Sequence, residues 1–427
     1  MREIPYEQLG LTLYHEQLAN GLQVYLLPRP GYRQVYATFT AHYGSVDSAF
    51  ARDGGPVRTV PDGIAHFLEH KMFESPAGDV FNQFAAHGAS ANAFTSFDQT
   101  TYLFSCTEDV AENIRILLDF VQEPYFTDEN VEKEKGIIAQ EIRMYEDHPE
   151  ARSFYGLLKA LYHAHPVRTE IAGTVESIGQ ITKDLLYECY STFYHPSNMV
   201  FFAVGGLDPH ALMDLIRDNQ AKKSFGPPPR ITRVLPDEPA DAAAARQETR
   251  LAVSQPRCLI GWKEVRVGLA GLDLLRQELL TGMVLDALFG RSADLYHELL
   301  DEGVIDPSFT WEYELAPSYG YSLVGGNVSR PEAFIARATA AVARARQEGI
   351  PKDVFERSRR KHIGRFLSGL DALGYVARHF TAYHLRQADL FATLDVLLSL
   401  RWEDANERLR EHFAEERQAV SLVLPRD

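Results

Sequence analysis

The sequence has three cysteines, no long apolar run and no excess of basic residues. Cys106, Cys189 and Cys258 have no paired spacing, which argues against a thiolate metal site and predicts a reducing, cytoplasmic location. No stretch approaches the roughly 20 apolar residues of a membrane span. Residues 1–6 lack the apolar core of a secretory signal. We therefore expect no membrane partner.

The charge balance of the chain is acidic. Asp and Glu number 59 against 43 Lys and Arg, which gives a formal net charge of −16 at pH 7. Nucleic-acid binding needs clustered basic residues, so this balance predicts no nucleic-acid partner. The excess of acid either serves solubility or attracts basic peptides.

Length and composition predict two domains. At 427 residues the chain is too long for one ordinary core. Residues 224–249 contain Pro227–Pro229 and Ala242–Ala245 with almost no periodicity, and we expect them to form a linker. The flanking segments, 1–223 and 250–427, share an order of strand, helix, strand pair, helices and strand. This shared order indicates an internal duplication.

The most informative stretch is His66-Phe67-Leu68-Glu69-His70, which reads H-x-x-E-H. On a helix, residues four apart lie about 40° apart around the axis, so both imidazoles can reach one metal ion. Glu69 is close enough to that face to contact a metal-bound water. Two histidines, a carboxylate base and an open position are what a hydrolytic zinc site needs. We expect Asp62 to cap this helix.

A third protein ligand is needed, and it is often a carboxylate. The helical pattern over residues 128–147 offers several acids. Two of them, Glu134 and Glu141, are seven residues apart and face nearly the same way. Spacing alone allows either a carboxylate pair at a metal or two acids on a solvated helix face.

A polar strand is predicted between the two motifs. Residues 90–95 and 101–105 have the pattern of paired strands joined by a turn at 96–99. Ser90 and Asn92 make the first strand polar for the interior of a sheet, which favours an accessible edge.

Taken together, the motifs resemble a known family. His66–His70 followed by Glu134–Glu141 is similar to the paired signature of the inverted-motif zinc peptidases, the family of pitrilysin, insulin-degrading enzyme and mitochondrial processing peptidase. The similarity covers residues 15–210 and, more faintly, 250–425. The run His70–Glu74 most resembles small bacterial members that work as pairs of half-size subunits. Other matching runs are Asn20–Val24, Gly88–Thr95, His165-Pro166, Gly173-Thr174 and Tyr194–Met199.

The resemblance implies a role for each matching residue. His66, His70 and Glu141 would be the ligands of one Zn²⁺ per chain. Glu69 would be the general base that activates a zinc-bound water, and Glu134 would orient a ligand histidine. A peptide substrate would add as a strand along the polar edge. The residues lining that edge would be Asn92, Ala93, Phe94 and Thr95.

The resemblance also implies an architecture and an activity. We expect an α+β fold of two similar domains, each a mainly antiparallel sheet with helices packed on one face, which form half of a clam-like chamber. Residues 1–223 would be the zinc-binding catalytic domain, and residues 250–427 would supply more of the substrate chamber and the dimer contacts. The expected function is that of a zinc-dependent endopeptidase for short or unfolded peptides.

One family feature is missing from the second half. Active members carry a motif similar to R-x-x-x-G-x-x-Y, whose Arg and Tyr contact substrate. Here Gly303 is in place, but Leu or Asp occupies the Arg position, and the Tyr position falls near Asp306 or Pro307. A second half-size subunit could supply both groups, or the chain could be a self-sufficient homodimer. A non-catalytic structural or metal-binding subunit of a processing-peptidase-like complex is the third alternative.

Overall fold

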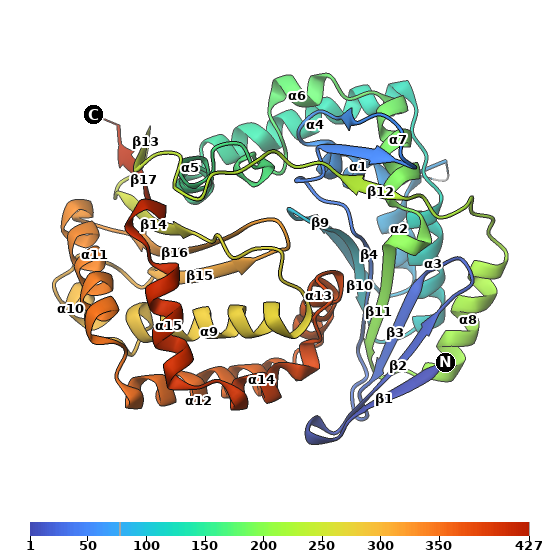
Figure 1. Cartoon of the computed structure of the whole chain (residues 1–427). Coiled ribbons are helices and arrows are strands. Elements are labelled where there is room, and N and C mark those ends of the chain that lie inside the picture. Colours follow the sequence, from blue (N-terminus) through green and yellow to red (C-terminus); the bar gives the residue numbers. More distant parts are fainter. Residues whose placement is uncertain (77, 427) are drawn as a thin grey trace. The chain divides into compact units, whose positions relative to one another are not determined.

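The computed structural model describes residues 1–76 and 78–426, and these form two compact units (Figure 1). Each unit draws on both halves of the sequence. None of the helices within the described residues combines the length and the apolar character that crossing a membrane requires. The first unit comprises Met1–Ile142, Glu170–Leu235 and Gly369–Leu385, and the second comprises Arg143–Thr169, Pro236–Ser368 and Arg386–Asp427.

The first unit is built on a seven-stranded sheet in the order β1-β2-β3-β11-β4-β10-β9. Every neighbouring pair is antiparallel except β3 and β11, which are parallel. The central strands β4 and β11 are buried almost throughout, so both faces of the sheet are covered there. The strands are β1 (Arg2–Tyr6), β2 (Leu11–Gln17), β3 (Gln23–Pro28), β4 (Val35–Ala41), β9 (Ser90–Thr95), β10 (Thr100–Cys106) and β11 (Met199–Gly205).

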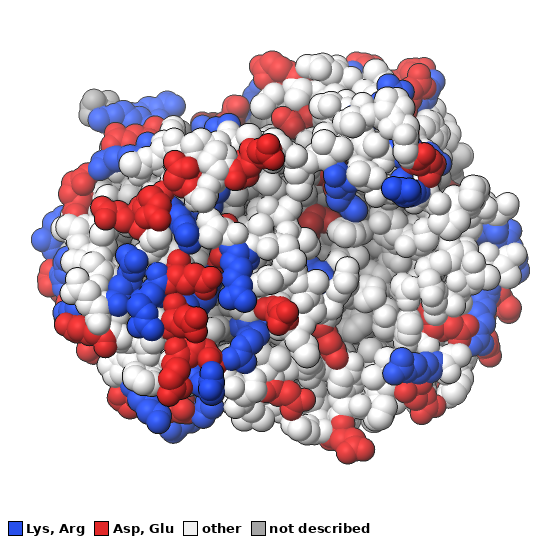
Figure 2. Space-filling view, in the orientation of Figure 1, with Lys and Arg blue, Asp and Glu red and all other residues white. Residues whose placement is uncertain are grey.

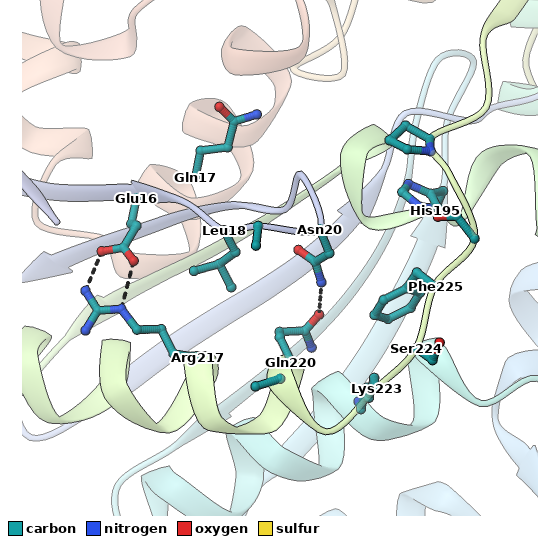
Figure 3. Close-up of a pocket in the computed structure, with 14 residues that line it drawn as sticks. Glu16, Gln17, Leu18, Asn20, His195, Arg217, Gln220, Lys223, Ser224 and Phe225 are labelled. Atoms are coloured by element: carbon teal, nitrogen blue, oxygen red, sulfur yellow. Dashed lines mark hydrogen bonds and ion pairs between the residues drawn. The ribbon is translucent and has the colours of Figure 1, made fainter.

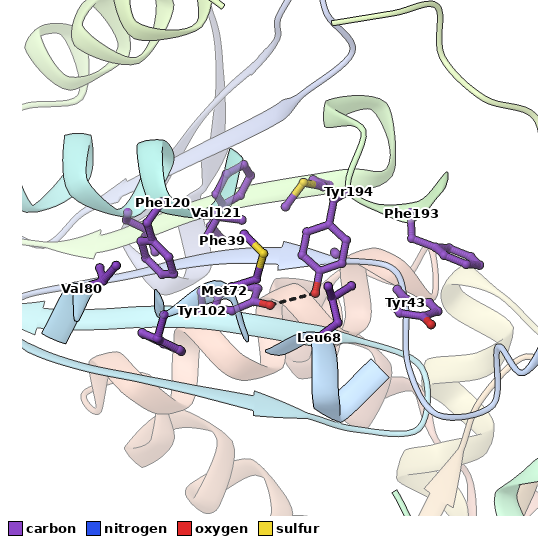
Figure 4. Close-up of a cluster of buried hydrophobic side chains, with 14 of the residues drawn as sticks. Phe39, Tyr43, Leu68, Met72, Val80, Tyr102, Phe120, Val121, Phe193 and Tyr194 are labelled. Carbon is purple, nitrogen blue, oxygen red and sulfur yellow. Dashed lines mark hydrogen bonds between the residues drawn. The ribbon is translucent and has the colours of Figure 1, made fainter. Parts of the chain in front are cut away.

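A buried aromatic and aliphatic cluster joins this sheet to its helices (Figure 4). Leu68 and Met72 of the helix α1 point into the cluster toward sheet residues such as Phe39 and Tyr102. The hydroxyls of Tyr102 and Tyr194 hydrogen-bond to each other at 2.9 Å, which satisfies both inside the core. The helices of this layer are α1 (Ile64–Met72), α2 (Val80–Ala86), α3 (Val110–Gln122), α4 (Asp128–Glu146), α6 (Val175–Gly179), α7 (Lys183–Phe193) and α8 (Pro209–Ala221).

The second unit has a five-stranded sheet in the order β13-β17-β14-β16-β15. Trp262 of β14 is fully buried and lies against Phe289 and Phe413 of the helical layer. The strands are β13 (Arg246–Leu251), β14 (Arg257–Lys263), β15 (Thr310–Leu315), β16 (Gly320–Asn327) and β17 (Gln418–Pro425). The helices are α9 (Gly271–Phe289), α10 (Asp294–Asp301), α11 (Pro331–Glu348), α12 (Lys352–Gly369), α14 (Thr393–Ser399) and α15 (Trp402–His412).

The two sheets have the same topology. The order β3-β11-β4-β10-β9 matches β13-β17-β14-β16-β15 strand for strand, and in both the first pair is parallel while the others are antiparallel. The two sheets thus share five strands in the same order and direction, in agreement with the internal duplication that the sequence indicated. The expected α+β fold of two similar sheet-and-helix domains is confirmed.

One helix from each half of the sequence lies against the sheet of the other half. From the C-terminal half, α13 (Leu373–Leu385) covers the second face of the first sheet, where Phe380 stacks on Phe202 of β11 with ring centroids 4.4 Å apart. From the N-terminal half, α5 (Pro149–Leu161) packs on the second sheet, where Leu157 lies against Gly261. A Cβ at position 261 would come within 2.8 Å of Leu157, so this approach needs glycine.

The units therefore divide the chain differently from the continuous domains 1–223 and 250–427. The expected linker also contains ordered structure. Within 224–249, β12 (Ile231–Arg233) pairs with β5 (Ala49–Arg52), and β13 begins at Arg246. Arg233 donates to the buried carboxylate of Asp47 at 2.6 Å. Main-chain pairing and this ion pair give order without a periodic apolar pattern, which is why composition suggested a linker.

Charges of both signs alternate on the surface of the second unit. Over α15, acidic and basic side chains lie next to each other (Figure 2). Arg401, the N-cap of this helix, pairs with Asp404 three residues further on. Such pairs are a local source of helix stability and solubility.

Substitution of Phe380 tests the exchanged helix. Phe380→Ala should lower the free energy of unfolding by about 3–5 kcal/mol, because it removes a ring that is 5% exposed and packs on the sheet. Arg378→Ala, at an exposed position of the same helix, should change it by less than about 0.5 kcal/mol. Urea unfolding followed by circular dichroism measures both. Equal effects of the two changes would contradict the packing of α13 on this sheet.

Candidate metal centre

The helix α1 begins at a glycine. Gly63 is the N-cap with φ of 89°, and a Cβ there would lie 2.4 Å from the carbonyl oxygen of Ala172. No side chain caps the helix, so the expected capping role of Asp62 is wrong. The carbonyl of Asp62 instead accepts a hydrogen bond from Ser177 Oγ at 2.8 Å. The left-handed backbone needed at position 63 explains why the chain enters the helix through glycine.

The predicted ligand atoms lie together in the first unit. His66 and His70 come from α1 and Glu141 comes from α4, and one ligand atom of each lies within 4.8 Å of the others. Each histidine places Nε2 at 3.6 Å from a Glu141 carboxylate oxygen. Two ligands about 2.0–2.1 Å from one tetrahedral Zn²⁺ would be roughly 3.3–3.4 Å apart, close to these separations. Two imidazoles and one carboxylate therefore fit zinc in both chemistry and spacing.

Glu134 holds the ring of His70 from the other side. Its Oε1 lies 3.1 Å from His70 Nδ1, which leaves Nε2 directed toward Glu141. Burial acts to raise the pKa of Glu134, but the hydrogen bond from His70 and the charge of Lys71 outweigh it and lower the pKa. A carboxylate on the far nitrogen of a histidine fixes the tautomer and orientation that metal ligation needs.

Burial and the nearby charges shift the pKa values of His66 and His70 in opposite directions. Burial, followed by the charge of His70, lowers the pKa of His66 to about 3, so its ring is neutral at pH 7. Burial also acts to lower the pKa of His70, but the hydrogen bond to Glu134 and the surrounding carboxylates raise it. The neutral imidazole is the form that binds metals.

Glu69 lies beside the cluster and is fixed by the strand β9. Thr95 Oγ1 donates to Glu69 Oε2 at 2.6 Å. Burial raises the pKa of Glu69, and the hydrogen bond from Thr95 counters this only in part. A carboxylate with a raised pKa is better able to accept and return a proton near neutral pH.

The strand β9 is the terminal strand of its sheet, next to β10. Asn92 is exposed, and its Oδ1 accepts from the backbone N–H of Ala93 at 2.8 Å. Phe94 is half-buried, and Thr95 alone of the four predicted substrate-contacting residues bonds to a residue of the site. The strand β9 is therefore an edge strand, as its polar composition predicted.

Two contacts of this site were not predicted from the sequence. The hydrogen bond from Thr95 to Glu69 joins residues 26 positions apart and has no local signal. Lys71 is fully buried and pairs with Glu134 at 3.3 Å. Its signal was available, because Lys71 interrupts the apolar stripe of Ile64, Phe67, Leu68 and Met72 at helical spacing.

The aromatic residues downstream of Gly303 belong to the interior of the second unit. Tyr319 and Tyr321 are each 2% exposed. Tyr313 donates its hydroxyl to Glu264 at 2.8 Å and accepts from Gln277 at 3.2 Å. These tyrosines have packing and hydrogen-bonding roles.

A separate cavity of 630 Å³ lies elsewhere in the first unit (Figure 3). Its wall pairs Arg217 with Glu16 and Asn20 with Gln220. None of its lining residues belongs to the metal cluster or to β9. The predicted site is therefore distinct from this cavity.

A duplicated sheet-and-helix fold with an inverted H-x-x-E-H helix and a distant glutamate is the arrangement of a zinc metallopeptidase. Residues 59–175 match the family Insulinase (Peptidase family M16), and residues 180–361 match the Peptidase M16 inactive domain. The chain is 45% identical over 427 residues to a zinc protease of Bacillus subtilis (strain 168), YmfH, described as uncharacterized, with both chains fully covered. The chain belongs to peptidase family M16.

Solved structures agree with this assignment. A protein from Alicyclobacillus acidocaldarius, described as an M16-like peptidase, superposes with a TM-score of 0.95 at 50% identity, covering 97% of this chain and 99% of the other. The first half of the periplasmic protease PqqL from Escherichia coli shares the fold, with a TM-score of 0.73 at 19% identity, covering 99% and 93%. The chain corresponds to 48% of the longer PqqL structure, so it has half-size length.

Proposed function

We propose that this chain is a zinc-dependent endopeptidase that cleaves short or unfolded peptides. The observation that carries the proposal is the position of Glu69, held by Thr95 beside the cluster of His66, His70 and Glu141. A purely structural or metal-binding subunit would need no carboxylate held there. The non-catalytic alternative is therefore the weaker of the two.

Each residue of the site would have a separate role in hydrolysis. His66, His70 and Glu141 would hold one zinc ion per chain. Zinc, when bound, supplies a Lewis acid and lowers the pKa of water at the site to about 7. Glu69 takes a proton from the attacking water and delivers it to the amine that leaves the cleaved peptide bond. Glu134 keeps the ring of His70 in place throughout.

The edge strand β9 would receive the substrate. A peptide that adds as a further strand gains main-chain hydrogen bonds with little demand on its sequence. Such a strand must be extended, which selects short or unfolded peptides over folded proteins. The Asn92 side chain now bonds to the Ala93 N–H, and it would give way to a carbonyl of the incoming peptide. The acidic surplus of the chain favours basic peptides among these substrates.

A second half-size subunit would complete the active site. The Arg and Tyr of the family motif have no counterpart around Gly303, and the chain has half the length of PqqL. The partner is either a different subunit that carries both groups or a second copy of this chain, in which other residues would take their place. In both cases the pair would enclose the substrate in a chamber. A cytoplasmic location remains a prediction from the cysteine content.

An assay of the purified chain alone tests the proposal. We expect one zinc per chain by elemental analysis and little turnover of a quenched fluorescent peptide, because the Arg and Tyr are missing. Addition of an Arg/Tyr-bearing half-size subunit should restore turnover. Strong turnover by the lone chain would reject the need for a different partner, and absence of zinc would contradict the proposed function.

A further inference from the structure

Lys71 occupies a core position of the helix that carries the metal motif. Ile64, Phe67, Leu68 and Met72 form the buried stripe of α1, and Lys71 falls within it at helical spacing. Its side chain is 0% exposed. A buried ammonium is costly unless carboxylates compensate it, and an apolar side chain would fill the same place at lower cost. The lysine therefore needs an explanation beyond packing.

The compensation comes from two glutamates with different surroundings. Lys71 Nζ lies 2.6 Å from Glu74 Oε2 and 3.3 Å from Glu134 Oε2. The Glu74 side chain is 34% exposed, whereas that of Glu134 is 8% exposed. Water can solvate Glu74 in place of the lysine. Within the described residues, the Glu134 carboxylate contacts Lys71 through one oxygen and His70 through the other.

We propose that Lys71 is a positioning residue for the metal centre that acts through Glu134. The ammonium holds Oε2, so Oε1 is presented to His70 Nδ1, and the chain of contacts runs from Lys71 to Glu134 to His70. Without the lysine, Oε2 would be buried without a partner, and the carboxylate would leave the geometry that orients the imidazole. This inference rests on the proposed zinc site and extends it by one residue.

A double-mutant cycle on zinc affinity tests the role of Lys71. Zinc dissociation constants of the metal-free full chain are measured by competition with a chromophoric chelator for wild type, Lys71→Met, Glu134→Gln and the double variant. Each single change should weaken zinc binding roughly 10-fold or more, within the 10–100-fold typical of residues that support a ligand. In the Glu134→Gln background, Lys71→Met should weaken zinc binding by less than about twofold. Lys71 acts on His70 only through the Glu134 carboxylate, and that carboxylate is already absent.

The unfolding temperature of each metal-free protein separates positioning from folding. The double variant leaves no buried charge unpaired, so it should fold even if Lys71→Met alone does not. In that case, equal zinc affinity of Glu134→Gln and the double variant supports the proposal. Glu74→Gln, which removes the more exposed partner, should keep zinc affinity within about twofold of wild type.

Two results would overturn the inference. One is an equal loss of zinc affinity from Lys71→Met in both backgrounds, and the other is no loss in the wild-type background. Because the readout is zinc binding without peptide, a chain that binds zinc but lacks peptidase activity even with an Arg/Tyr-bearing subunit would contradict the proposed function and leave the role of Lys71 intact. A wild-type chain that binds no zinc would overturn both.

Discussion

Glu69→Gln should abolish most of the peptidase activity and leave zinc in place. The substitution keeps the size of the side chain, and the amide oxygen can still accept the hydrogen bond from Thr95. The amide cannot take a proton from water, so the general-base contribution is lost, which we expect to cost roughly 10²–10⁴-fold in kcat. The active two-subunit form is the material for this assay.

The zinc content of the variant shows whether activity is lost with the general base or with the metal. Glu69 is not one of the three residues that converge on a common point, so elemental analysis should give the same zinc per chain in the variant and in wild type. A matched control is Glu112→Gln, a half-exposed acid on α3 that should change neither quantity. Retained activity in Glu69→Gln would remove Glu69 as the base. Loss of zinc together with activity would show that the residue supports the metal centre instead.

The local parts of this site could be predicted from the sequence. Residues four apart on a helix face the same way, so His66 and His70 were identified as a ligand pair from their spacing alone. Spacing alone could not show whether Glu141 is a metal ligand or a solvated acid, because both would have the same helical pattern. Family resemblance made that choice, and the structure places its carboxylate 3.6 Å from both imidazoles.

Contacts between elements distant in the sequence were beyond this reasoning. An amphipathic pattern shows that a helix has an apolar face but does not show which sheet it covers. For that reason the exchange of α5 and α13 between the two sheets was not foreseen, and continuous domains were expected. The bond from Thr95 to Glu69 was missed on the same grounds, since it depends on how α1 packs against β9. The place of Lys71 in the apolar stripe of α1 could have indicated a buried cation, but not that its partner is Glu134 on α4.

The candidate ligand set lies in one of the two copies of the duplicated sheet. The second sheet repeats the strand order of the first, and β15 takes the edge position that β9 holds in the first unit. Among the described residues, however, His66, His70 and Glu141 form the one group of three or more acidic, histidine or cysteine side chains that could hold a metal ion. The fold is thus repeated while the ligand set is not, in agreement with the match of residues 180–361 to an inactive domain.

Glu141→Gln should remove zinc from the protein. Glu141 is the carboxylate that approaches both histidines, with Oε1 nearest His66 and Oε2 nearest His70. An amide is a neutral and weaker ligand for Zn²⁺, so affinity should fall by more than the roughly 10–100-fold that loss of a supporting residue costs. Competition with a chromophoric chelator measures the change, and activity should disappear with the metal.

Protein stability provides a second readout that does not depend on turnover. A ligand that binds only the folded state raises the unfolding temperature by mass action, so zinc should stabilise the wild-type chain and a chelator should reverse the effect. The same additions should leave the unfolding temperature of Glu141→Gln nearly unchanged. Glu132→Gln, an exposed acid on the same helix, should behave as wild type. Full zinc occupancy in Glu141→Gln would remove Glu141 from the ligand set, and the third ligand would then have to come from another residue.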